Sequence, residues 1–153
     1  MIYMINIVND WRPAGEIILW TSKKQNRNYF GWHVRADSIG CLSVIDLIDR
    51  MAATSYPTYR TIPLKRPPNF SFEEMCRKSD LVLAEKLKFS FDPSLPADTW
   101  EAIYFEGAFK LTVGSKFLSL LRTGFSDINR GEGDYSIGPG RHERRPEDRL
   151  WFW

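Results

Sequence analysis

Short stretches in which apolar and polar residues alternate recur along this chain, and they constrain its fold more than any other feature. The clearest lies within 83–91, where three large apolar residues alternate with polar ones: Leu87, Phe89 and Phe91 against Lys86, Lys88 and Ser90. The segment 109–113 repeats the pattern with Phe109, Leu111 and Val113 against Lys110 and Thr112. A period of two is typical of a strand that buries one face. Both segments are therefore predicted to be strands of a half-covered sheet.

Turn signals join these strands into hairpins. Glu106-Gly107-Ala108 separates 101–105 from 109–113, and Gly107 favours a tight turn because glycine adopts positive φ at little cost. A polar, basic stretch separates 16–21 from 29–35, so 16–35 is predicted to be a hairpin.

Three further short strands are predicted at 59–65, 134–137 and 150–153. Pro63 has no N–H to donate to a neighbouring strand. The strand 59–65 is therefore expected at a sheet edge or at a bulge.

Two segments have the three- and four-residue apolar spacing of amphipathic helices. The first, about 39–53, follows a capping residue at Asp37 or Ser38 and has an apolar stripe of Cys41, Leu42, Val44, Ile45, Ile48 and Met51. The second, about 115–127, is expected to begin at a Ser115 cap, with a stripe of Phe117, Leu118, Leu121, Phe125 and Ile128. A short helix near 72–79 is also predicted.

The predicted fold class is α+β: an antiparallel or mixed sheet of roughly six to eight short strands with two main helices packed on one face. The 153 residues fit a single globular domain, 1–153, with room for a substantial core.

Composition excludes several classes of protein. Net charge is only +2, which is too balanced to indicate nucleic-acid binding by itself. No stretch approaches the roughly 18 apolar residues of a membrane span, and the first residues lack the pattern of a secretory signal. We therefore expect a cytoplasmic protein with no membrane partner, whose two cysteines, Cys41 and Cys76, are free thiols.

The most motif-like segment is SDINRGEGDYSIG, residues 126–138. Asp127, Asn129 and Gly131 resemble the first ligand positions of a calcium loop, but Glu132 and Gly138 stand where that loop needs glycine and a bidentate glutamate. A phosphate loop would lead into a helix, whereas these glycines follow one. The favoured interpretation is a turn from helix to strand, with a weak metal site or a partner contact as alternatives.

No catalytic set is recognisable. The two histidines and two cysteines lack the paired spacing of a structural zinc site, so no metal and no cofactor are expected. His33 is predicted to be a solvent-facing strand residue, and Cys41 a buried and unreactive one. These features favour a non-enzymatic role, although a small-ligand or enzyme pocket between sheet and helices remains a third hypothesis.

Two basic features suggest partners. The first is an arginine-rich loop beside two C-terminal tryptophans: Arg141, His142, Arg144, Arg145, Arg149, Trp151 and Trp153. Glu143, Glu147 and Asp148 dilute this charge, which favours a solvated loop. If the loop is functional, these residues are predicted to contact an acidic surface of another protein, because arginine and tryptophan are common hot spots. The second is the basic tip of the 16–35 hairpin: Lys23, Lys24, Arg27 and Tyr29. Basic groups beside aromatic ones are typical of single-stranded nucleic-acid binding, although a solvated hairpin tip above core aromatics is the favoured interpretation.

The leading hypothesis is a small protein-interaction module, in particular an inhibitor or immunity-type protein that neutralises another protein. Single-stranded nucleic-acid binding through the 16–35 hairpin is the alternative. The aromatic content of 14%, with six tryptophans, is expected to serve mainly the core, and a partner surface formed by an excess of these residues is the alternative. An exposed edge at Pro63 or at 150–153 would also support a homodimer.

Overall fold

The computed structural model describes residues 7–22, 31–65, 81–139 and 149–153. Within these ranges the chain forms two helices and nine strands: β1 (Ile17–Ser22), β2 (Trp32–Ala36), α1 (Ser38–Ala52), β3 (Thr58–Pro63), β4 (Leu81–Leu83), β5 (Lys86–Phe91), β6 (Trp100–Phe105), β7 (Ala108–Val113), α3 (Ser115–Asn129), β8 (Tyr135–Ile137) and β9 (Leu150–Phe152). The predicted α+β class is confirmed, with slightly more strands than expected. The predicted helix near 72–79 lies outside the described residues.

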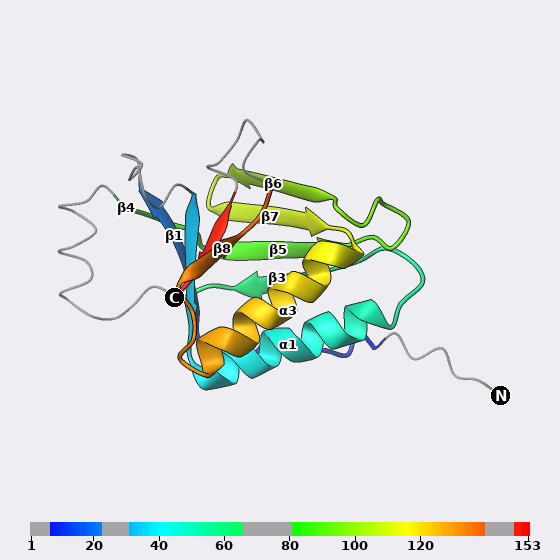
Figure 1. Ribbon diagram of the computed structural model, residues 1–153, viewed down its shortest axis with the longest axis horizontal. Helices are drawn as coiled ribbons and strands as arrows, with labels where there is room; N and C mark the ends of the chain where they lie inside the picture. Colours follow the sequence, from blue (N-terminus) through cyan, green and yellow to red (C-terminus); the bar gives the residue numbers. More distant parts are fainter. Residues whose placement is uncertain (1–6, 23–30, 66–80, 140–148) are drawn as a thin grey trace.

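The strands are divided between two mixed sheets. One has five strands in the order β4-β1-β2-β9-β8, and the other has four in the order β3-β5-β7-β6. In Figure 1 the helices α1 and α3 run side by side over one face of the four-stranded sheet, and the five-stranded sheet closes one end of this layer, its strands crossing those of the first sheet steeply. The core lies where the two sheets and the helices meet.

Both predicted hairpins are present. β1 and β2 pair antiparallel from Ile17 opposite Ala36, and β6 and β7 pair antiparallel up to Phe105 opposite Ala108. The turn between β6 and β7 consists of Glu106 and Gly107, with φ of 48° and 85°. Two successive positive φ angles define the turn whose twist matches a hairpin, which explains the glycine.

Two strand pairs are parallel, β2 with β9 and β5 with β7. β7 lies between β5 and β6, so the chain passes beyond β7 before it returns to pair with β5. This order explains why both sheets are mixed although most strands are joined by short connections.

The prediction of one continuous strand over 83–91 is wrong, because its residues belong to two sheets. The N–H of Ala84 donates to the Leu19 carbonyl in β1 at 2.9 Å, whereas the N–H of Glu85 donates to the Gly107 carbonyl beside β7 at 2.8 Å. The backbone therefore changes partner sheet within one residue. The expected inward positions Leu87, Phe89 and Phe91 are nevertheless confirmed as buried.

The start of α1 follows the prediction, because Asp37 Oδ1 accepts from the N–H of Gly40 at 2.6 Å. One residue of its predicted stripe is misplaced: Leu42 is 54% exposed, and Leu47 is buried instead. Leu47 lies three residues after Val44 and four before Met51, so it completes the buried face that Leu42 leaves.

The predicted stripe of α3 is buried from Phe117 to Phe125, and Ile128 packs against it. The predicted Ser115 cap is wrong, because Gly114 occupies the N-cap and no side chain caps the helix. Ser115 is instead the first helical residue.

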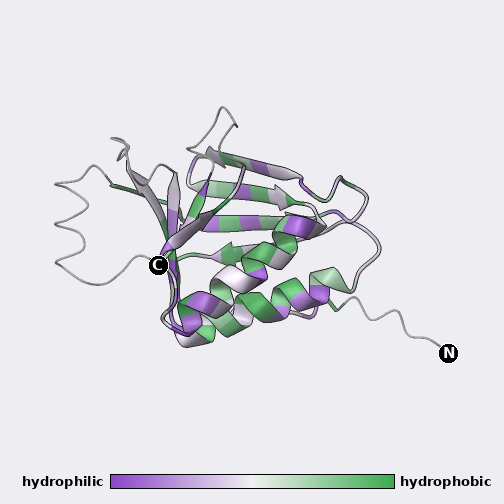
Figure 2. Ribbon diagram, viewed as in Figure 1, coloured by the Kyte–Doolittle hydropathy of each residue, from purple (hydrophilic) through white to green (hydrophobic). Residues whose placement is uncertain are grey.

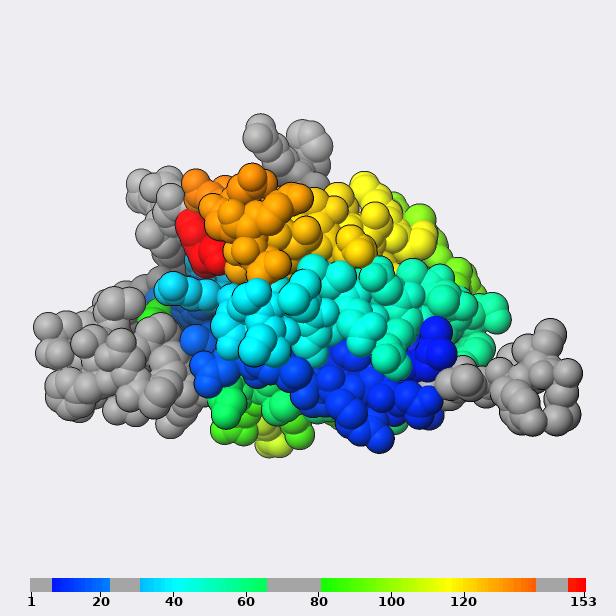
Figure 3. Space-filling view, turned by 90° about the horizontal axis from the view of Figure 1, so that it is seen from below, coloured from blue at the N-terminus to red at the C-terminus, as the bar shows by residue number. Residues whose placement is uncertain are grey.

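Apolar surface is concentrated inside this arrangement. Figure 2 shows green, hydrophobic positions recurring along both helices and alternating with purple ones along the strands of the four-stranded sheet, and the buried hydrophobic residues form a core cluster. Figure 3 shows the molecule from below, where the described N-terminal segment, in blue, lies along α1, in cyan. Trp11 anchors that segment, since its side chain is buried and its Nε1 donates to the Ser43 carbonyl at 2.8 Å.

Candidate functional site

Four aromatic side chains gather on the outer face of the five-stranded sheet, and we call them the aromatic row: Trp20, His33, Trp151 and Trp153. Trp20 lies opposite His33 across β1 and β2, and His33 lies opposite Trp151 across β2 and β9. Their neighbours Leu19, Trp32, Val34, Leu150 and Phe152 are buried in the core, so these four point outward. All four are half-buried and keep part of their surface exposed.

The rings of the aromatic row lie close together with similar orientations. Trp20 and His33 have centroids 5.4 Å apart and planes 19° apart, which is a cross-strand stacked pair. Trp151 and Trp153, two residues apart, have centroids 6.0 Å and planes 15° apart. Such pairs add to the energy of burial alone, so the row is a preorganised surface rather than a set of independent side chains.

A hydrogen bond fixes the centre of the aromatic row. Trp153 Nε1 donates to His33 Nδ1 at 2.8 Å, and the two rings are inclined by only 18° with centroids 5.9 Å apart. An N–H donor bonds along the plane of its ring, so these rings meet edge to edge rather than face to face. His33 must be neutral to accept this bond, because the protonated imidazole has no acceptor.

Arg149, predicted to contact a partner, has a structural role at the start of β9. Its Nε donates to Ser136 Oγ at 2.9 Å, and its guanidinium also donates to the carbonyls of Ser136 and Pro139. Its own carbonyl accepts from the N–H of Trp32 at 2.9 Å. Arg149 thus holds β9 between β2 and β8, which places Trp151 and Trp153 in the row.

The other predicted contact residues, Arg141, His142, Arg144 and Arg145 in one group and Lys23, Lys24, Arg27 and Tyr29 in the other, lie outside the described residues. Their points of attachment are described, however. Trp32 lies opposite Leu150, and Leu150 lies opposite Ile137, so β2, β8 and β9 meet at one end of the five-stranded sheet. Both basic segments are therefore joined to the sheet at the same end.

The segment 126–138 is a turn, as favoured from the sequence. α3 ends at Asn129, Gly131 adopts a φ of 74°, and β8 begins at Tyr135. Hydrogen bonds from Tyr135 and then from Arg130 lower the pKa of Asp127. These bonds occupy its carboxylate, and the described part of the chain contains no cluster of three or more His, Cys, Asp or Glu residues suited to a metal ion.

Cys41 is buried, as predicted. Burial, and secondly the charge of Asp37, raises the pKa of Cys41 to about 11, so its thiol is protonated near neutral pH. The second cysteine, Cys76, lies outside the described residues.

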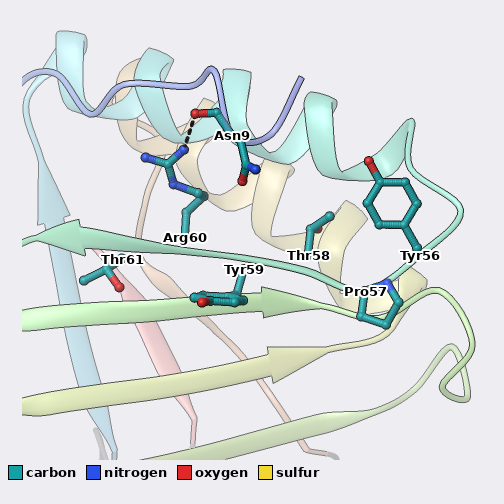
Figure 4. Close-up of a pocket in the computed structure, with 7 residues that line it drawn as sticks. All are labelled: Asn9, Tyr56, Pro57, Thr58, Tyr59, Arg60 and Thr61. Carbon is teal, nitrogen blue, oxygen red and sulfur yellow. Dashed lines mark hydrogen bonds between the residues drawn. The ribbon is translucent and has the colours of Figure 1, made fainter. Parts of the chain in front are cut away.

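A shallow groove of about 520 Å³ runs along the edge strand β3 (Figure 4). The strand that contains Pro63 lies at the edge of the sheet, as predicted from the lack of an N–H in proline. Arg60 spans the groove and donates to the carbonyls of Val8 and Asn9 at 2.9 and 2.8 Å. It also lies 5.5 Å from the centre of the Trp11 ring, so it fixes the N-terminal segment to the sheet.

Two spaces between sheets and helices bear on the third hypothesis. In the core, twelve apolar residues surround a void of about 10 Å³, which holds at most one water molecule. Nearer the surface, a more open pocket of about 370 Å³ lies between α3 and β8.

Sequence reasoning missed Trp20 and His33 as members of a site. Their outward alternation with Leu19 and Val34 is visible in the sequence, but IILW, residues 17–20, is apolar throughout and gives no sign of which face is covered. In the ranges that the structure describes, no helix is both long and apolar enough to cross a membrane.

Comparison with known proteins finds no matching family model, no matching curated protein and no matching solved structure.

Proposed function

We propose that this chain is a protein-interaction module and that the aromatic row is part of its contact surface. The observation that carries the proposal is the assembly of Trp20, His33, Trp151 and Trp153 from three strands into one half-exposed row. Tryptophan is enriched among the residues that dominate protein–protein affinity. Its rigid side chain loses little conformational entropy on binding.

The sequence of the two segments attached at this end of the sheet indicates the kind of partner. The segments attached at its end of the sheet include Lys23, Lys24 and Arg27 in one and Arg141, Arg144 and Arg145 in the other. Although Glu143, Glu147 and Asp148 offset the second group, the first has no acidic residue between 23 and 30. An acidic surface on the partner would complement this end and accelerate association.

The proposal is tested by affinity capture from nuclease-treated lysate of the host, with three tagged proteins compared side by side. The first is the unchanged chain, the second carries Trp20→Ala and Trp151→Ala, and the third carries Tyr59→Ala and Ile103→Ala on the other sheet. A protein captured by the first and third, and about 30-fold less by the second, supports the row as a hot spot. Equal capture by all three would refute it.

We propose further that binding neutralises the partner, as in an inhibitor or immunity-type protein. The captured protein's own activity, or its toxicity when expressed alone, is then measured with and without the chain. Loss of activity on stoichiometric addition supports inhibition. Unchanged activity would leave a binding module and exclude an inhibitor.

A further inference from the structure

The outer face of the four-stranded sheet is a second distinctive surface, and it points away from α1 and α3 (Figure 1). Strand register defines it, because directly paired residues share a face. The inward rows include the buried residues Leu87, Phe89, Leu111 and Val113. The outward rows are Tyr59, Thr61 and Pro63 on β3, Lys86, Lys88 and Ser90 on β5, Ala108, Lys110 and Thr112 on β7, and Glu101, Ile103 and Phe105 on β6.

Three lysines occupy the middle of this face. Lys88 lies directly opposite Lys110 on the parallel strands β5 and β7. Lys86 lies two residues before Lys88 on β5 and shares its face of the sheet. Like charges directly opposite each other destabilise a sheet. No ion pair in the described part of the chain involves these lysines, and the only carboxylate in the outward rows, Glu101, lies opposite Thr112. The centre of the face is therefore complementary to an anion.

Exposed apolar side chains flank the lysines on both sides. Tyr59 is 68% exposed on the edge strand β3, and Ile103 and Phe105 are 61% and 69% exposed on the opposite edge strand β6. Ile103 is directly paired with Lys110. Cations bracketed by exposed rings on one sheet face form a mixed surface, rather than the scattered apolar residues of an ordinary exterior.

We infer that this face binds single-stranded nucleic acid: Lys86, Lys88 and Lys110 contact phosphates, while Tyr59 and Phe105 stack against bases. Sheet faces that present aromatic rings beside cations bind single strands in this way. A protein partner is less well matched, because lysine is depleted from the centres of protein interfaces. This activity is separate from protein binding by the aromatic row, and it uses a different sheet from the 16–35 hairpin.

The test is fluorescence anisotropy of a labelled single-stranded oligothymidylate over a salt series. Three phosphate contacts predict a slope of log affinity against log salt of about −2, since each contact on a single strand contributes about −0.7. Lys88→Ala with Lys110→Ala should reduce the slope to about −0.7. Tyr59→Ala or Phe105→Ala should weaken binding about fivefold or more without changing the slope.

Matched controls separate this face from the other basic groups of the chain. Lys116 is exposed on α3, so Lys116→Ala should bind as the unchanged chain does. The Lys88 and Lys110 variant should fold with equal or greater stability, because it removes a repulsive pair. Salt-independent binding, no binding at low salt, or a slope lost only with Lys23→Ala and Lys24→Ala would overturn the inference. Competition by polyglutamate as strong as that by unlabelled oligonucleotide would also overturn it, and would indicate an acidic protein instead.

Discussion

A glycine in the second helix controls how closely α3 approaches the sheet that carries the aromatic row. Gly124 is buried in α3 and faces Phe152, the fully buried residue between Trp151 and Trp153 on β9. A Cβ added at Gly124 would lie 2.8 Å from Cε1 and 2.9 Å from Cδ1 of the Phe152 ring. These separations are shorter than carbon–carbon contact distances, so Gly124→Ala forces one element to move.

Two opposing effects determine the expected stability change. Replacing glycine by alanine inside a helix stabilises it by about 1 kcal/mol. An extra methyl group in a tightly packed core costs about 1–3 kcal/mol. Phe152 has little freedom to shift, because Phe125 packs against it edge-on at 5.3 Å and Tyr135 lies parallel to it at 6.1 Å. The cost should therefore be near the upper limit, for a net loss of about 1–2 kcal/mol.

Urea denaturation monitored by circular dichroism measures this change, with Ser119→Ala on the exposed side of α3 as the control. The control should be neutral or stabilising by up to about 0.5 kcal/mol, because it reports helix propensity alone. Near-ultraviolet circular dichroism of Gly124→Ala should also change, since a shift of Phe152 displaces both neighbouring tryptophans. A stabilised Gly124→Ala protein would show that Phe152 is not held against α3, and would refute the reasoning.

Four further predictions concern individual side chains. Asp37→Ala should lower the free energy of unfolding, measured by urea denaturation, by about 1–2 kcal/mol, because Asp37 Oδ1 accepts from two backbone N–H groups. A decrease below about 0.5 kcal/mol, the size of an ordinary surface change, would contradict its role as cap. Thr58→Val should raise the free energy of unfolding by about 1 kcal/mol, since the buried Thr58 hydroxyl has no hydrogen-bond partner among the described residues, and a decrease would reveal a partner. Hydrogen bonds from Tyr135 and Arg130 lower the pKa of Asp127, so its carboxylate stabilises the fold above the unfolded pKa of about 3.9, and this contribution is lost as pH falls through the lower folded pKa. Tyr135→Phe should raise the midpoint of Asp127 in a carboxyl NMR titration, and an unchanged midpoint would contradict this. With its pKa raised to about 11, Cys41 should resist iodoacetamide at about pH 8 in the native protein and react after unfolding, as peptide mapping would show.

Local structure was predictable because local rules determine it. Alternation gave β5 and β7, glycine gave the turn at Gly107, and an acidic cap gave the start of α1. These features depend on residues only a few positions apart. The errors at Leu42 and Ser115 arise where more than one residue satisfies the same rule: Leu42 and Leu47 for the buried face of α1, and Gly114 and Ser115 for the cap of α3. Tertiary packing selects between them.

The division into two sheets was not predictable from the same rules. The alternation breaks at Ala84 and Glu85, where an alanine stands at an outward position and a glutamate at an inward one. The break alone does not show that Ala84 bonds to β1 and Glu85 to the residue before β7. Strand periodicity reports which face is buried, and it does not report which neighbour supplies the hydrogen bonds. The lysine-bearing face was visible as outward positions, but only the β5–β7 pairing brings Lys88 next to Lys110.

The aromatic row depends on the longest-range pairing in the described chain. β9 lies parallel to β2 although more than a hundred residues separate them, and this pairing places Trp151 and Trp153 beside His33. The buried side of β9, through Phe152, is fixed by Gly124, so the outer and inner faces of the same short strand are coupled. A partner that binds the row should therefore stabilise the contact between α3 and the sheet. Conversely, a packing change at Gly124 should weaken partner binding without altering any residue of the contact surface.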